Sequence, residues 1–183
     1  MNKTSILKKQ DHVPIFTVLS HIRQYDYDTY IHCVHVANYV RRILDSFDIQ
    51  NNDLYQAALV HDIGKIFVEK SIINKTDKLD ERERICIDYH SFYGYLYLQD
   101  SGFPDDICKY ILFHHGVKPE WGEYISDVIQ PPKFFLDILR ACDIYDALIS
   151  NRPYRKALSK IAAMDILLQN NIDENIMEHM GVM

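Results

Sequence analysis

The sequence lacks the features of a membrane-spanning, secreted or nucleic-acid-binding protein. No apolar run approaches the roughly 18 residues that a bilayer-spanning helix needs. The start of the chain carries lysines but no apolar stretch of the kind found in secretory signals. The formal net charge is −6, so the overall electrostatic field repels duplex nucleic acid. These absences predict a cytoplasmic protein whose partner is neither a membrane nor duplex nucleic acid.

Cysteine is scarce and scattered. The four cysteines are Cys33, Cys86, Cys108 and Cys142, and no CxxC pair occurs. Each lies in a segment with helical periodicity, far from the others in sequence. This spacing favours reduced, buried thiols over disulfides or a zinc knuckle, in keeping with the cytoplasm.

The chain also lacks repeats, low-complexity tracts and linkers rich in serine or glycine. With 183 residues it is long enough to bury a core without disulfide or metal support. We therefore expect a single domain over residues 11–183, preceded by a flexible N-terminus over residues 1–10.

Apolar residues recur at helical spacing along the chain. The clearest series predicts a long helix beginning near Asp26, with an apolar face formed by Ile31, Val34, Ala37, Val40, Ile43, Leu44 and Phe47. The next predicted helix is capped by Asn52 or Asp53 and ends near Gly64. Further helices are predicted over residues 80–99, 104–115 and about 133–150, with two short ones after Ser159 and Asp173. The predicted fold class is all-α.

Histidine and aspartate are arranged as a metal centre would require. The residues of interest are His32, His61, Asp62, His90, His114, His115 and Asp143. A pair of divalent ions needs several imidazole nitrogens and a carboxylate that spans both ions, and Asp62 beside His61 suits bridging. A lone helical histidine is more often a hydrogen-bonded core residue. The His61-Asp62 and His114-His115 doublets at helix ends, however, are poor core material.

The order of these residues resembles the H…HD…D signature of the HD superfamily of metal-dependent phosphohydrolases. His32, His61-Asp62 and Asp143 carry that signature. The text around it is similar to the HD-GYP branch, in HDIGKI (61–66), the HH pair (114–115) and DIYDAL followed by SNRPYRKALS (143–159). The resemblance covers about residues 26–165 and implies an HD-domain helical bundle.

Two positions depart from the HD-GYP pattern. Gly122-Glu123-Tyr124 stands where that branch has Gly-Tyr-Pro, so the GYP motif is degenerate. Asp137 replaces the arginine usually found a turn and a half before the last aspartate. The metal-ligand set is therefore complete, whereas the loop that recognises substrate in the branch is altered.

The resemblance implies a role for each residue. One metal would be held by His32, His61, Asp62 and Asp143, and a second by His90, His114 and His115, with Asp62 bridging. Asp28, one turn before His32, is a candidate ligand for a third metal, or else a carboxylate that answers the helix dipole. The mixed imidazole and carboxylate ligands favour iron or manganese over calcium.

Three basic residues resemble the family's phosphate contacts. Lys65 is the counterpart of a lysine that meets a substrate phosphate, and Asp62 and Lys65 are the expected catalytic pair. Arg152 and Arg155, in RPYR, are placed to hold phosphate oxygens. Their ordinary alternatives are a surface lysine and arginines that cap a helix C-terminus.

The implied activity is a metal-dependent phosphodiesterase acting on a cyclic dinucleotide or a related nucleotide through a metal-bridged hydroxide. Two alternatives stay open. One is an HD-type phosphatase or nucleotidase acting on small phosphomonoesters. The other is a non-catalytic HD domain that binds a nucleotide or a partner protein. The sequence leaves the oligomeric state undetermined.

Overall fold

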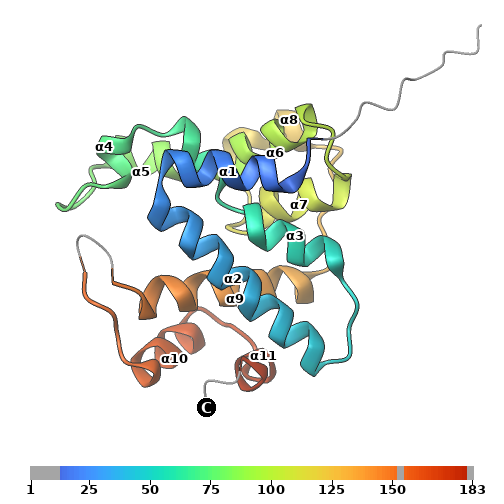
Figure 1. Cartoon of the computed structure of the whole chain (residues 1–183), viewed down its shortest axis with the longest axis vertical. Coiled ribbons are helices and arrows are strands. Elements are labelled where there is room, and N and C mark those ends of the chain that lie inside the picture. The colour runs from blue at the N-terminus through green and yellow to red at the C-terminus, as the bar shows by residue number, and fades with distance from the viewer. Residues whose placement is uncertain (1–12, 152–154, 181–183) are drawn as a thin grey trace, which may run out of the picture.

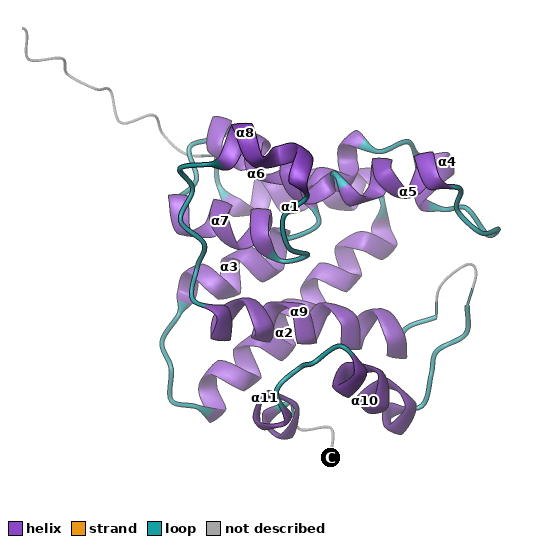
Figure 2. Cartoon of the chain, turned by 180° about the vertical axis from the view of Figure 1, so that it is seen from behind, coloured by secondary structure: helices purple, strands orange, loops and turns teal. Residues whose placement is uncertain are grey.

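The computed structural model describes residues 13–151 and 155–180, and this part of the chain is helical with no β-strand (Figures 1 and 2). The all-α prediction is confirmed. The helices are α1 (Ile15–Tyr25), α2 (Tyr27–Ser46), α3 (Asn52–Val60), α4 (Lys70–Ile73), α5 (Glu81–Asp88), α6 (His90–Asp100), α7 (Asp105–Phe113), α8 (Gly122–Ile125), α9 (Lys133–Ile149), α10 (Lys160–Gln169) and α11 (Glu174–His179), with 3₁₀ turns η1 (Ile63–Phe67) and η2 (Pro119–Trp121).

The long helices α2 and α9 pack together in the middle of the molecule (Figure 1). Helix α3 packs on α2 and α7, and α6 packs on α7 and η1, while α10 and α11 cover the opposite end. Every helix from α1 to α3 contributes buried apolar side chains to one core that continues through α6, α7 and α9. No helix of the described residues is long and apolar enough to cross a bilayer.

Side-chain caps fix where α2 and α3 begin. The Asp26 carboxylate accepts the Thr29 backbone N–H at 2.8 Å, so α2 begins where the sequence predicted. The cap of α3 is Asn51, whose side-chain oxygen accepts the Leu54 N–H at 2.9 Å. The prediction of Asn52 or Asp53 was wrong because a cap must reach the amide three positions later, and that amide belongs to the first buried residue of the helix.

The predicted helix over residues 80–99 is two helices, α5 and α6. Asp80 and Glu83 form a capping box at the start of α5. The α5 segment ends at Asp88, and α6 begins at His90 after the intervening Tyr89. The break places His90 at the first turn of a new helix, where its ring turns toward the core instead of following α5.

The prediction that Gly64 ends a helix was wrong. Gly64 is a contact point between two elements. Helix α3 ends at Val60, and Gly64 lies inside η1. A Cβ at Gly64 would lie 1.8 Å from the His90 carbonyl oxygen and 2.6 Å from the Gly94 nitrogen. Only glycine permits this approach, which brings the residues just before η1 beside the start of α6.

All four cysteines are free thiols, as the sequence indicated. Cys33, Cys108 and Cys142 are buried, whereas Cys86 is exposed on α5, so the prediction of buried thiols was wrong for Cys86. Helix α5 buries none of its residues completely, which explains why an apolar residue within it stays in solvent.

Candidate metal centre

Seven side chains from five parts of the chain converge at one place. They are His32 on α2, His61 after α3, Asp62 before η1, His90 at the start of α6, His114 and His115 after α7, and Asp143 on α9. Six of the seven are buried, and His115 is the exposed member, with 40% of its side chain accessible. Buried polar groups at this density need partners, so the cluster points to a site and not to core packing.

The first ligand group consists of His32, His61 and Asp143, whose donor atoms all lie within 4.8 Å of one another. The Asp143 Oδ1 atom is 2.9 Å from His32 Nε2 and 3.8 Å from His61 Nε2. Two imidazoles and a carboxylate at this spacing suit a first-row divalent metal.

The second group consists of His90, His114 and His115, again with donor atoms within 4.8 Å. The Nε2 atoms of His90 and His114 face each other at 3.2 Å. Asp143 reaches toward this group as well, with Oδ2 at 3.5 Å from His115 Nε2.

Asp62 lies between the two groups. Its Oδ1 is 3.3 Å from His90 Nε2, and its Oδ2 is 3.5 Å from His61 Nε2 and 3.8 Å from His32 Nε2. One carboxylate oxygen therefore faces each group, which is the placement that a bridging ligand requires.

Backbone carbonyls set the tautomers of three histidines. His61, His90 and His114 each donate Nδ1–H to the carbonyl oxygen three residues earlier, at 2.9, 2.6 and 2.6 Å. With Nδ1 as the donor, Nε2 carries the lone pair, and these are the nitrogens that face the centre. All three histidines follow or begin a helix, where the free carbonyls of the preceding turn are available.

A carboxylate orients the remaining buried histidine. His32 Nδ1 lies 2.6 Å from Asp146 Oδ2, and the other oxygen of Asp146 is 3.0 Å from His35 Nδ1. Sequence reasoning missed His35. Its spacing of three residues from His32, which puts both on one face of α2, was the available signal.

Burial and local charge set the protonation of the centre. Burial lowers the pKa of His90 to about 3 and also lowers the pKa values of His61 and His114, so these rings are neutral and able to ligate. Burial alone would also lower the pKa of His32, but hydrogen bonds to Asp143 and Asp146 outweigh it and raise the pKa to about 9.

The two carboxylates are ionised despite burial. Burial acts to raise the pKa of Asp62, but Lys65 and the surrounding histidines hold it well below its ordinary value. For Asp143 the same effect of burial is overcome chiefly by the hydrogen bond to His32. The centre thus combines the neutral imidazoles of His61, His90 and His114 with two anionic carboxylates, the forms in which these groups bind metal, whereas His32 must release a proton to ligate.

Unpartnered buried atoms support a metal fit. His61 Nε2 and Asp62 Oδ1 are buried and have no hydrogen-bond partner among the described residues. Such atoms are costly in a folded protein unless something fills the space between them. A cation in each ligand group would satisfy them, one at His61 Nε2 and the other at Asp62 Oδ1, so the donor set fits divalent metal ions.

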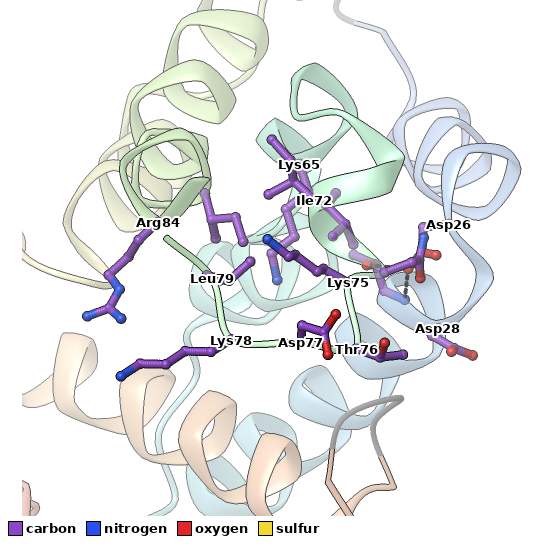
Figure 3. A pocket seen from close by; sticks show the side chains of 14 residues that line it. Asp26, Asp28, Lys65, Ile72, Lys75, Thr76, Asp77, Lys78, Leu79 and Arg84 are labelled. Atoms are coloured by element: carbon purple, nitrogen blue, oxygen red, sulfur yellow. Dashed lines mark hydrogen bonds between the residues drawn. The ribbon is translucent and has the colours of Figure 1, made fainter. Parts of the chain in front are cut away.

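Lys65 connects the centre to a pocket. Its Nζ lies 2.6 Å from Asp62 Oδ2, and its side chain lines a pocket of about 500 Å³ (Figure 3). Asp28 is exposed and lines the same pocket, and it belongs to neither ligand group of the described chain. Its role as a ligand of a third metal stays a prediction.

Of the two predicted phosphate-binding arginines, the structure describes Arg155 alone. The Arg155 guanidinium donates to the Ala147 and Leu148 carbonyl oxygens at 2.5 and 3.0 Å, which caps the C-terminal end of α9. Sequence analysis had this capping as the alternative for the two arginines. Arg152 lies outside the described residues.

The structure shows the surroundings of Asp137 and Gly122, the two positions that depart from the HD-GYP pattern. Asp137 pairs with Lys133 one turn earlier on α9. Gly122 begins the short helix α8 with ordinary helical angles, φ −51° and ψ −41°. Beside it Trp121 is buried and stacks on Phe92, with ring centroids 5.6 Å apart.

The sequence model of the HD domain matches residues 29–148, a span that contains all seven clustered residues. The chain belongs to the HD domain family. Membership implies divalent metal binding, in agreement with the two ligand groups.

Relatives of this HD chain include phosphodiesterases. It is 31% identical over 142 residues to the 3'3'-cGAMP-specific phosphodiesterase 3 of Vibrio cholerae serotype O1, covering 76% of this chain and 31% of that protein. It is 28% identical over 150 residues to a cyclic di-GMP phosphodiesterase of Pseudomonas aeruginosa, covering 80% of this chain and 36% of the relative. The chain thus spans about a third of the length of these relatives.

The fold of the HD chain is that of a solved HD domain. The crystal structure of the L. monocytogenes phosphodiesterase PgpH HD domain in complex with cyclic-di-AMP superposes with a TM-score of 0.69. The match covers 91% of this chain and 92% of the other at 18% identity, so it establishes a shared fold and the HD-domain helical bundle.

Proposed function

We propose that this HD domain is a metal-dependent phosphodiesterase that hydrolyses a cyclic dinucleotide or a related nucleotide. The observation that carries the proposal is the placement of Asp62, with one oxygen toward each of two histidine-rich ligand groups. The relatives named for cyclic dinucleotide hydrolysis support the substrate class.

The proposed centre is held by His32, His61, Asp62 and Asp143 on one side and by His90, His114 and His115 on the other. Divalent ions in such a centre lower the pKa of a coordinated water and neutralise charge on phosphoryl oxygens. Iron and manganese are the proposed metals, since both accept imidazole and carboxylate ligands, and Asp28 is the proposed ligand if a third ion binds. The proposed location is the cytoplasm.

The surrounding residues of the chain position and stabilise the substrate. The Lys65 ammonium, beside Asp62 in the wall of the pocket, is placed to contact a non-bridging phosphoryl oxygen. Asp146 holds the His32 ring in place through Nδ1. We propose phosphate contact for Arg152 and for Arg155, whose guanidinium donates to the Ala147 carbonyl oxygen on α9.

The test is hydrolysis by anaerobically purified protein reconstituted with Fe(II) or Mn(II), with products resolved by chromatography. The panel contains cyclic dinucleotides, linear dinucleotides and nucleoside monophosphates. We expect a cyclic dinucleotide to be opened to its linear form, and chelation of the metal to stop the reaction.

The other outcomes identify the alternatives. Phosphate release from monophosphates alone would replace the proposal with a phosphatase. Metal-loaded protein that binds a cyclic dinucleotide but yields no product would replace it with a binding domain.

A further inference from the structure

A pocket lies beside the metal centre, and Lys65 contacts the centre and lines the pocket. Its volume of about 500 Å³ lies within the range of small-molecule sites. Its walls come from the start of α2, the connection between α4 and α5, and α5 itself, with Lys65 on the side of the metal centre. The residues that line the pocket include none of the seven clustered residues of the metal centre.

Four basic side chains line this pocket, but they are not equivalent. Lys65 lies against Asp62 at 2.6 Å. Lys75 forms an ion pair with Glu83, whose two carboxylate oxygens accept hydrogen bonds from its ammonium at 2.7 and 2.6 Å. Lys78 and Arg84 are exposed, and no carboxylate of the described residues lies within ion-pair distance of either. Their charge is thus available to a ligand.

Figure 3 shows Lys78 and Arg84 on one side of the pocket and Asp26 and Asp28 on the other, with Asp77 between Lys78 and the two aspartates. Lys65 lies apart from Lys78 and Arg84 in the same view. The pocket thus has two separate cationic regions that can bind anions. One is Lys65 with the metal centre, and the other is Lys78 with Arg84.

We propose that Lys78 and Arg84 form a second phosphate subsite, which binds the phosphodiester group that is not at the metal centre. The inference rests on the proposed function and deepens it. It selects ligands with two separated phosphates, such as a cyclic dinucleotide, over ligands with one phosphate.

The charge of the ligand favours such a subsite. Each phosphodiester carries one negative charge, and the chain has a net charge of −6. A phosphate bound away from the metals therefore needs local cations to offset repulsion from the rest of the protein. The planar guanidinium of Arg84 can donate to two phosphate oxygens, while the Lys78 ammonium adds a second charge.

The experiment compares Lys78→Ala, Arg84→Ala and the double variant with Arg82→Ala as the control. Arg82 is an exposed arginine on the same helix as Arg84 that does not line the pocket. Each protein, loaded with Mn(II), is assayed on cyclic di-GMP, which has two phosphates, and on bis(p-nitrophenyl) phosphate, which has one.

For cyclic di-GMP we expect KM to rise about tenfold in each single variant and further in the double variant, with kcat nearly unchanged. The dependence of KM on salt should become shallower, because the contacts that salt screens are gone. Kinetics on bis(p-nitrophenyl) phosphate, and all kinetics of Arg82→Ala, should match the unmodified protein.

Equal effects on both substrates, or no effect on either, would overturn the subsite. If the unmodified protein hydrolyses neither substrate, the proposed function fails separately. The subsite is then decided by calorimetric binding of cyclic di-GMP, where an unchanged Kd in the double variant would reject it and a Kd raised about tenfold or more would retain it.

Discussion

Asp62→Ala is expected to reduce phosphodiester hydrolysis at least about a thousandfold and to lower the bound metal below that of the unmodified protein. Asp62 places one carboxylate oxygen toward each histidine group, with Oδ1 at 3.3 Å from His90 Nε2 and Oδ2 at 3.5 Å from His61 Nε2. Its removal takes a ligand from both groups at once. The measurements are steady-state hydrolysis of a cyclic dinucleotide and elemental analysis of metal content after dialysis.

The matched control is Asp45→Ala, because Asp45 is an exposed aspartate on α2 outside the centre. Its turnover and metal content should equal those of the unmodified chain. Far-ultraviolet circular dichroism establishes that both variants are folded before they are compared. Undiminished turnover in folded Asp62→Ala would show that hydrolysis does not use this centre.

Gly64→Ala is expected to destabilise the fold by about 3 kcal/mol or more, and to impair metal binding with it. The added Cβ would lie 1.8 Å from the His90 carbonyl oxygen and 2.6 Å from the Gly94 nitrogen, and both are backbone atoms that cannot rotate away. Relief requires η1 to separate from α6. That movement would carry Asp62 away from His90. The free energy of unfolding in urea measures the loss.

Gly122→Ala supplies the contrast. Gly122 has helical φ and ψ, and a Cβ there would meet nothing within 4 Å. Alanine should therefore leave stability unchanged or raise it by up to about 1 kcal/mol. Equal stability of the Gly64 and Gly122 variants would contradict the close contact between η1 and α6.

The sequence was sufficient to predict the helices whose signals are local. The predicted helix starts near Asp26, Ser159 and Asp173 are confirmed. In the structure each of these side chains caps its helix by accepting a backbone N–H from the first turn that follows. The break at Tyr89 could not be predicted, because it depends on the position of His90 against η1 and not on a local breaker residue. Gly64 was misread for the same reason, since its role is a contact with a distant backbone.

The metal-ligand groups could be predicted because their residue types are distinctive and their order is that of a known family. The side chains that hydrogen-bond to these ligands could not be predicted. The bond from His32 to Asp146 joins positions 114 residues apart, and His35 reaches Asp146 only because α2 and α9 pack together. From the sequence, Arg155 could either contact phosphate or cap a helix C-terminus. Its hydrogen bonds to the α9 carbonyl oxygens, which place its guanidinium at the helix end, are seen only in the structure.

The central claim is that two ligand groups sharing Asp62 bind two divalent ions. Anomalous diffraction from crystals of the Mn(II)-loaded protein tests it most directly. We expect one anomalous peak among His32, His61 and Asp143, a second among His90, His114 and His115, and Asp62 in contact with both. A single peak, or peaks away from these residues, would contradict it.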